Sequence, residues 1–404
     1  KGETMSDVLK TEKITFTEGV AMIIGTNIGA GILSVSYAAR KAGYLPLLFW
    51  LVVVGIITTV TMLYVAEATL RTKQHEQLSG LAKRYVGGIG SWLMFASVTV
   101  NALGALIAYM SGSGDLMHSL FGIDKKLGSI IFFIPAALVL GLGLKALGRS
   151  EKLITGLMVL MLSVLIGATL LFPSTDFSHL LDGDWMYMIP VFNLVVFIYC
   201  AQYIVPEMAR GLAHAPKQLP KAIITGMLCT FTLIALVPLS VISLNGLDNV
   251  SQVATISWGT ALGSWAFFMA NGFALFAMLT SYWGIGGSFL TNIADRFSLP
   301  VDSNVKVRCG AVALVALPPF ALAYSGLVGF VDALYFAGAF SGVVLSILPY
   351  LIVRGARSSG NRTPEWQCPA WMSHPLVYGL IFLLYSLSAV YAVLAKLDLL
   401  PAGW

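Results

Sequence analysis

The sequence predicts an all-α polytopic membrane protein in which ten helices form an inverted five-plus-five repeat and an eleventh helix follows. Three observations predict this fold: the composition, the number of long apolar segments, and the interruption of the first and sixth of them. Of the 404 residues, 57% are hydrophobic and only 11% are charged, whereas a soluble domain carries about 25% charged residues. A lipid bilayer is therefore the main solvent of this chain.

Eleven apolar segments are long enough to cross a bilayer as helices, which takes about 20 residues each. They lie at about 17–40, 44–70, 88–119, 128–145, 151–172, 188–209, 219–244, 262–289, 309–325, 327–353 and 375–395. A short amphipathic piece is expected at 77–87, on the cytoplasmic surface.

This segmentation predicts a simple domain organisation. Residues 1–16 are expected to be a cytoplasmic tail, of which 1–4 (KGET) are interpreted as a remnant of cloning. The transport core is expected at 17–353, divided into the repeats 17–172 and 188–353, with the eleventh transmembrane helix at 375–395.

The Lys and Arg residues divide unevenly between the two sides of these segments. If the N-terminus lies inside, 19 of the 24 fall in inside segments and 5 outside. Because cytoplasmic loops carry an excess of Lys and Arg, the sequence predicts an inner (plasma) membrane protein with a cytoplasmic N-terminus and an external C-terminus. The basic charge is thus a topology signal, and nucleic-acid binding has no remaining support.

The first apolar segment contains GTNIGAG, from Gly25 to Gly31. Gly costs roughly 1 kcal/mol relative to Ala in a helix interior. Backbone groups that are freed at membrane depth are tolerated only against protein or a cavity. We therefore expect a deliberately broken helix whose free N–H and C=O groups hold a ligand.

The sixth segment, MIPVFNLVVFIYCAQYIVPEMARG, is also interrupted, by Asn193, Gln202, Pro206 and Glu207. Interruptions in the first and sixth of ten spans are typical of an inverted repeat, with the binding site at mid-membrane between the two breaks. Free amides at helix N-termini suit an anionic group, and free carbonyls suit a cation. An amino acid carries both charges, so it fits this arrangement better than a sugar or a lipid.

The glycine stretch and its continuation, GTNIGAGILSVSYAARKAG, resemble the first-helix signature of the amino acid/auxin permease family, within the amino acid–polyamine–organocation superfamily. The resemblance is narrower to the bacterial aromatic and hydroxy amino acid permeases. It extends to ALIAYMSGSGDL (105–116), HAPKQLPKAI (214–223) and TSYWGIGGSFLTNIADRF (280–297), and so covers residues 20 to about 300. It implies the leucine-transporter fold and secondary amino acid transport by alternating access. FIYCAQYIVPE departs from the family, because it lacks the usual glycine-rich break.

A possible cation site combines the first and eighth segments. Ala277, Thr280 and Ser281 can present one carbonyl and two hydroxyls to the same point of a helix surface. The resemblance to the leucine-transporter fold adds the carbonyls of Gly25 and Ile28, which gives the oxygen ligands that a hard cation such as Na⁺ prefers. The alternative interpretation is that Thr280 and Ser281 only make an interhelical hydrogen bond.

Proton coupling is the alternative to sodium. Some relatives of this fold replace the sodium with a lysine in the fifth helix, but 156–172 contains no charge here. Placing an acidic side chain inside a membrane costs free energy, so each such residue is treated as a candidate functional residue. Glu67 and Asp115 lie near helix ends, where paired structural roles are expected. Glu207 is a candidate for helix capping, gating or proton carrying, and Asp332 for an outer gate or a structural pair.

The substrate carboxylate is expected on the amides of Gly29, Ala30 and Gly31. Its ammonium group is expected on carbonyls near Asn27 and around the sixth-segment break, at Phe197, Ile198 and Cys200. The residues expected to line the substrate side chain are Asn101, Ala105, Tyr109, Tyr199, Gln202, Phe276, Ser281 and Ile285. Small Ala105 leaves room for a bulky or aromatic substrate.

The sequence thus predicts a Na⁺-coupled importer of neutral, aromatic or large apolar amino acids, with Na⁺ as coupling ion and no other cofactor. An H⁺-coupled permease is the first alternative. An ion or metal carrier of the same fold is more remote, because GTNIGAG has no acidic or soft ligand and the sixth segment offers only Cys200. A membrane-embedded enzyme is remote as well, because we find no catalytic constellation. The oligomeric state stays open.

Overall fold

The computed structural model describes residues 13–142, 148–301, 304–397 and 399–400. Most of the expected tail, including KGET, lies outside the described residues. The described part is helical, with the chain passing through 15 α-helices. They are α2 (Phe16–Asn27), α3 (Ala30–Ala38), α4 (Tyr44–Leu70), α5 (Leu78–Tyr85), α6 (Gly88–Phe121), α7 (Lys125–Leu142), α8 (Gly148–Leu170), α9 (Met188–Ile198), α10 (Val205–Gly211), α11 (Gln218–Asn245), α12 (Ala254–Leu262), α13 (Ser264–Phe297), α14 (Val305–Ser325), α15 (Phe330–Ser359) and α16 (Pro375–Lys396).

Eight described helical segments are long and apolar enough to cross a membrane, and the bent pair α2 and α3 makes a ninth. The other two expected spans, 128–145 and 151–172, correspond to α7 and α8. These two helices adjoin residues 143–147, which the structure does not describe. The multi-pass architecture is therefore observed, whereas the count of eleven spans and the five-plus-five repeat stay predictions.

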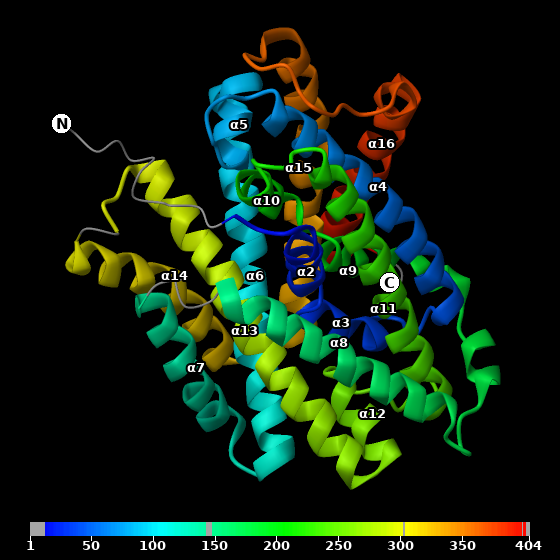
Figure 1. Ribbon diagram of the computed structural model, residues 1–404. Coiled ribbons are helices and arrows are strands. Elements are labelled where there is room, and N and C mark those ends of the chain that lie inside the picture. Colours follow the sequence, from blue (N-terminus) through cyan, green and yellow to red (C-terminus); the bar gives the residue numbers. More distant parts are fainter. Residues whose placement is uncertain (1–12, 143–147, 302–303, 398, 401–404) are drawn as a thin grey trace.

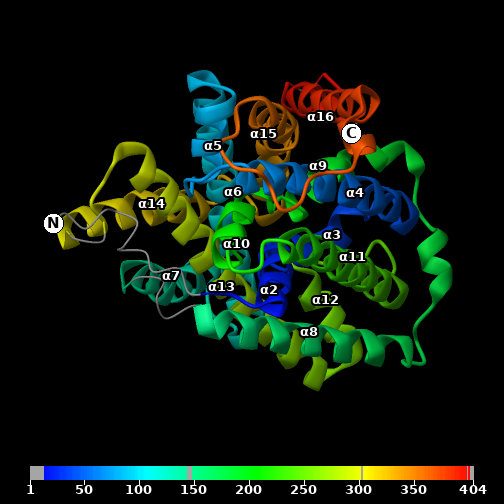
Figure 2. The same ribbon diagram turned by 45° about the horizontal axis from the view of Figure 1, so that its top comes forward.

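The helix α2 lies at the centre of the bundle (Figure 1). It packs against α8, α11 and α13, and the tilted view shows it between them (Figure 2). The helix α3 packs against α9, and α15 packs against α4, α6 and α9. The two helices that the sequence predicts to be broken are therefore enclosed by the longer, unbroken ones.

Both expected breaks are present. The last backbone hydrogen bond of α2 runs from Ile28 N to Ile24 O, 2.8 Å, and the chain bends by 46° before it continues in α3. In the sixth segment α9 ends at Ile198, and the chain resumes as the 3₁₀ helix η4 (Gln202–Ile204) and then α10. Glycine-rich sequence breaks the first helix, whereas the second break forms without glycine.

Glycines let α15 approach the second broken helix. A Cβ at Gly338 would lie 1.9 Å from the carbonyl oxygen of Asn193, and one at Gly342 would lie 2.2 Å from Val196 Cγ1. Small residues at membrane helix interfaces permit this backbone approach. The end of α9 is thereby fixed against a long helix.

The helix α12 lies between two of the expected spans, where no element was predicted. Its nine residues are too few to span a membrane, so a search for membrane-length segments passes over it. Trp258 is nevertheless fully buried, and its Nε1 donates to Thr169 Oγ1 at 2.7 Å. This hydrogen bond attaches α12 to the end of α8.

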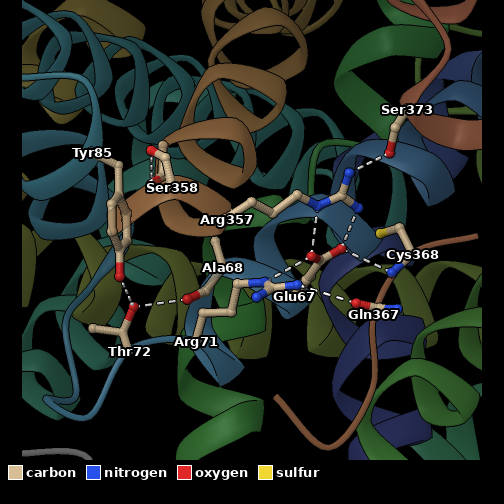
Figure 3. A network of polar contacts seen from close by, with 11 residues as sticks. Glu67, Ala68, Arg71, Thr72, Tyr85, Arg357, Ser358, Gln367, Cys368 and Ser373 are labelled. Carbon is tan, nitrogen blue, oxygen red and sulfur yellow. Dashed lines mark hydrogen bonds and ion pairs between the residues drawn. The ribbon is translucent and has the colours of Figure 1, made fainter. Parts of the chain in front are cut away.

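We call the end of the bundle that holds α5, α10 and residues 71–77 the basic end (top of Figure 1). Glu67 is fully buried there (Figure 3). Its Oε1 accepts from Arg71 Nε at 2.8 Å and from Arg357 Nε at 2.7 Å. Its Oε2 accepts from Arg357 Nη2 at 2.7 Å and from the backbone N of Cys368 at 2.8 Å. One carboxylate thus joins α4, α15 and the connection to α16.

We predict that Glu67→Ala destabilises the protein strongly, by about 3–5 kcal/mol, because it leaves Arg357 partly buried without its counter-ion. The matched control is Asp115→Ala, which removes the 2.7 Å ion pair with the exposed Lys125 and should cost about 0–1 kcal/mol. Thermal unfolding of both purified variants checks this. Equal shifts in Tm would contradict the structural role of Glu67.

Candidate functional site

The first break exposes backbone groups of both signs. The last four carbonyls of a helix and the first four amides of the next have no partner within the helix. At this break they are the carbonyls of Gly25 to Ile28, at the end of α2, and the amides that open α3 at Ala30. The amides carry the positive end of a helix dipole, which suits a carboxylate.

The second break lies directly against the first. A Cβ at Gly31 would lie 2.6 Å from Ile198 Cγ1 and 3.2 Å from Ile198 Cα. Only glycine therefore lets the start of α3 rest on the end of α9. The tight packing brings the residues of the two breaks side by side.

A buried cavity lies between the breaks. Its lining comprises Thr26, Asn27, Gly29, Gly31, Asn101, Tyr109, Phe197, Ile198, Cys200, Tyr203 and Ile285. Its volume is about 10 Å³, which is room for about one water molecule. The structure is therefore closed around this point, and an amino acid enters only when the lining residues move apart.

The cavity includes nine of the residues that the sequence singles out, namely Asn27, Gly29, Gly31, Asn101, Tyr109, Phe197, Ile198, Cys200 and Ile285. Asn101 donates from Nδ2 to Ser341 Oγ at 3.1 Å, which ties α6 to α15. Asn27 donates only to a weak acceptor, Met227 Sδ at 3.7 Å. Its Oδ1 is buried and has no hydrogen-bond partner among the described residues, so this oxygen is an available acceptor at the cavity.

One of the expected cation ligands, Ser281, lies against the first break. A Cβ at Gly29 would lie 3.0 Å from Ser281 Oγ and 2.8 Å from the hydroxyl of Tyr109. Ser281 thus faces the break directly. Thr280 donates its hydroxyl proton within its own helix, to Phe276 O at 3.0 Å and Ala277 O at 3.1 Å. Its oxygen keeps lone pairs, and the sodium site stays a prediction.

Phe276 does not line the cavity, and this expectation was wrong. It is 68% exposed on the outside of α13. At 100° per residue, position 276 lies opposite position 285, which does line the cavity. The sequence placed both in the eighth span but did not give the rotation of the helix.

Four other expected residues lie near the cavity without lining it. Ala105 is buried within α6, and Ala30 contributes the backbone that opens α3. Gln202 donates from Nε2 to Thr61 Oγ1 at 3.1 Å. Tyr199 is buried against α4, with its Cζ 3.3 Å from a Cβ built on Gly55. Gln202 and Tyr199 therefore attach the second break to α4.

The two acidic candidates lie outside the cavity. Glu207 is at the basic end, where Gln77 Nε2 donates to its Oε2 at 2.9 Å. Arg210 lies 3.7 Å from its other oxygen. Asp332 is exposed in the first turn of α15. Burial first, and then the charge of Arg210, lowers the pKa of nearby His75, so that imidazole is neutral at pH 7.

Thr26 and Tyr203 line the cavity but were not singled out. Tyr203 belongs to η4, directly after the second break. Regular helical spacing gives no position for a side chain that follows an irregular turn. Thr26 lies within GTNIGAG, and its hydroxyl donates to Met22 O at 2.7 Å. Its position in that stretch was the feature of the sequence that could have predicted its place at the cavity.

A sequence profile described as the tryptophan/tyrosine permease family matches residues 11–392. The chain belongs to the tryptophan/tyrosine permease family. It is a multi-pass membrane permease and not an enzyme. The narrower resemblance to aromatic amino acid permeases is thereby confirmed, whereas the wider placement in the amino acid/auxin permease family stays a prediction.

Curated proteins similar to this chain cover most of it. The tryptophan-specific transport protein of Shigella flexneri is 24% identical over 95% of this chain and 96% of its own length. The tyrosine-specific transport system 1 of Haemophilus influenzae is 23% identical over 85% of this chain and 88% of its own. The glutamine transporter 2 of Aliivibrio fischeri is 22% identical over 69% of this chain and 75% of its own.

Among solved structures, a mutant of the manganese transporter of Eremococcus coleocola is similar, with a TM-score of 0.67. The match covers 98% of this chain and 91% of the manganese transporter at 12% identity. This likeness concerns the fold alone.

We predict that Gly31→Ala lowers stability, by about 1–3 kcal/mol, because its Cβ would overlap Ile198 and force the two breaks apart. The control is Gly284→Ala in α13, where a Cβ meets nothing within 4 Å and where the better helix former should leave Tm unchanged or raise it. Thermal unfolding of the two variants checks this. A Gly31→Ala protein as stable as the Gly284→Ala protein would show that the breaks are not tightly packed.

Proposed function

We propose that the chain imports aromatic amino acids by secondary active transport, with Na⁺ as the coupling ion. The observation that carries the proposal is the contact of the two breaks, because residues at the start of α3 and at the ends of α2 and α9 line one cavity. Such a pair of opposite partial charges suits the carboxylate and ammonium groups of a zwitterion. The names of the tryptophan- and tyrosine-specific relatives support an aromatic side chain.

In the proposed complex the carboxylate accepts from the amides of Gly29, Ala30 and Gly31. The ammonium group donates to the free carbonyls at the end of α9 and to Asn27 Oδ1, which otherwise lacks a partner among the described residues. The aromatic ring lies among Tyr109, Phe197, Tyr203 and Ile285, which line the cavity. Aromatic side chains offer stacking and edge contacts to a ring.

Alternating access is supported by the closed cavity. Its volume of about 10 Å³ requires the lining helices to separate before a substrate enters. At the basic end, Ile14 N donates to Gly211 O at 3.2 Å, and Gln77 contacts Glu207; in the proposed cycle these contacts open to release the substrate. The leucine-transporter fold, the inverted repeat and a cytoplasmic basic end are parts of the same proposal.

Sodium coupling rests on the carbonyls of Gly25 and Ile28, which lie beyond the last backbone hydrogen bond of α2, together with Ala277 O and the hydroxyls of Thr280 and Ser281. One sodium ion entering at 100 mV releases about 2.3 kcal/mol. This energy suffices for roughly fifty-fold accumulation of substrate.

Proton coupling is the second candidate, because the side chain of Glu207 is 44% exposed at the basic end and belongs to the second broken helix. A metal carrier has less support. The described residues contain no group of three or more His, Cys, Asp or Glu side chains that could hold a metal ion.

Uptake of labelled L-tryptophan into proteoliposomes tests the coupling ion. We expect a sodium gradient to drive uptake, and a potassium gradient at constant pH not to. Thr280→Ala combined with Ser281→Ala should abolish the sodium dependence. The control is Thr291→Ala in the same helix, which loses only a hydrogen bond to Gly287 O. Uptake that follows a pH gradient instead would favour the proton alternative.

We predict that Asn27→Leu weakens L-tryptophan binding by about ten- to hundred-fold, because a hydrogen bond to a charged group contributes about 1.5–3 kcal/mol. Indole-3-propionate lacks the ammonium group, so its weaker affinity should not change. Calorimetric titration of both ligands checks this. Asn271→Leu is the matched control. Asn271 in α13 is also buried, and its Oδ1 has no partner within the described ranges, but it lies outside the cavity. An equal loss for both ligands would remove Asn27 from the ammonium site.

A further inference from the structure

A second cavity lies between α4 and α11 and does not belong to the substrate site. Its lining comprises Leu51, Val52, Gly55, Ile56, Thr59, Ile224, Met227, Leu228 and Phe231. Its volume is about 260 Å³, near the lower end of the about 300–1,000 Å³ that ligand pockets occupy. We call it the α4/α11 groove.

The groove opens sideways into the membrane. Both helices are long and apolar enough to span a bilayer, and the lining residues lie within the first half or so of each, away from its ends. Val52 and Ile56 on one wall, and Ile224 and Leu228 on the other, are exposed. The groove is therefore continuous with the lipid-facing surface of this multi-pass protein, and its surrounding medium is hydrocarbon.

The groove offers too few hydrogen-bonding groups to hold ordered water. Thr59 has the only side-chain hydroxyl among the lining residues, and it donates to Gly55 O at 2.7 Å within its own helix. A buried water needs two to four polar partners. An apolar molecule therefore fits the groove, and the medium around it supplies acyl chains.

A second copy of this chain fits less well. Membrane helix pairs meet through small residues such as Gly, Ala and Ser. Here the exposed rim consists of the branched side chains Val52, Ile56, Ile224 and Leu228, and the small residue Gly55 lies below them. A flexible chain can enter between these side chains, whereas a rigid helix would be held off by them.

The inner surface of the groove touches both breaks of the substrate site. Met227 is buried, and its Sδ accepts from Asn27 Nδ2 at 3.7 Å. On the opposite wall, the position of a Cβ on Gly55 lies 3.3 Å from Cζ of Tyr199, in the second break. An occupant in contact with Gly55 and Met227 therefore packs against one neighbour of each break.

We propose that one acyl chain of a bilayer phospholipid occupies the α4/α11 groove and stabilises the closed arrangement of the two breaks. The walls of the groove contact Asn27 and Tyr199, so an occupant opposes any rearrangement that moves Met227 or Gly55 away from these neighbours. The coupling to substrate affinity rests on the proposed function, whereas the occupancy of the groove does not.

Photolabelling tests the occupancy. The protein is reconstituted in phosphatidylcholine nanodiscs that contain a trace of phosphatidylcholine with a diazirine in one acyl chain, and labelled peptides are mapped by mass spectrometry. We expect labelling of 51–59 and 224–231 to exceed that of other lipid-facing helices at least five-fold. Val52→Trp should remove this excess by filling the groove. Val164→Trp on α8 is the matched control, because Val164 is 44% exposed and Val52 is 40% exposed.

Leu228→Trp fills the groove from the other wall and guards against a folding defect specific to Val52→Trp. Unchanged labelling of α14 and α16 reports that each variant is folded. Uniform labelling of all lipid-facing helices, or labelling only by a diazirine fatty acid and not by the phospholipid, would overturn the proposal. Protection of the groove in a cross-linked dimer would overturn it in favour of a second copy.

Titration with L-tryptophan tests the coupling. In detergent, added phosphatidylcholine should raise the Kd of the wild type several-fold, because closure lowers the fraction of protein that is competent to bind. Val52→Trp should lose this response and Val164→Trp should keep it. A mapped lipid with no effect on Kd would overturn the coupling. A wild type that binds no tryptophan would contradict the proposed function, and the labelling pattern would still decide the occupancy.

Discussion

Backbone amides and carbonyls that are freed inside a membrane need partners from the protein, because lipid offers none. This constraint explains why α2 and α3 lie at the centre of the bundle and why the second break packs directly on the first (Figure 1). Gly31 allows α3 to pack on Ile198 at the end of α9. Gly338 allows α15 to approach the carbonyl of Asn193 in the same helix. A helix break thus leaves backbone groups without hydrogen-bond partners, and these groups must be enclosed by other helices. The enclosed groups form a candidate binding site.

Because of the same constraint, neutral polar groups and charged side chains lie in two different parts of the bundle. Among the described residues that line the central cavity, the polar groups are backbone atoms and neutral side chains, and Asn27 Oδ1 has no partner in the described part of the chain. At the basic end, full charges appear, and the buried carboxylate of Glu67 is balanced by Arg71 and Arg357 (Figure 3). A neutral centre can bind and release a zwitterion without leaving a buried charge behind. The charged cluster joins α4, α15 and the connection to α16.

Much of the fold follows from the sequence because membrane-length apolar segments and helix-breaking residues are local signals. The helix α4 begins at Tyr44 and ends at Leu70, as the hydrophobic pattern indicates. The first break falls in the glycine-rich stretch, and the second falls directly before the polar residue Gln202. Helix rotation is not local, so Phe276 was assigned to the wrong face. The position of Tyr203 depends on an irregular turn, and the closure of the cavity depends on packing between distant segments. The spacing of residues in the sequence therefore predicts neither the position of Tyr203 nor the closure of the cavity.

The Glu67 cluster has a consequence for the synthesis of the chain in the membrane. Arg357 follows Glu67 by 290 residues, so α4 is made and inserted long before that partner exists. Arg71 lies one turn away on the same chain and already contacts Glu67 Oε1. A local ion pair can therefore accompany the carboxylate through insertion, and the arginine of α15 can add to it when that helix arrives. The order of translation thus matches the order in which the charge needs its partners.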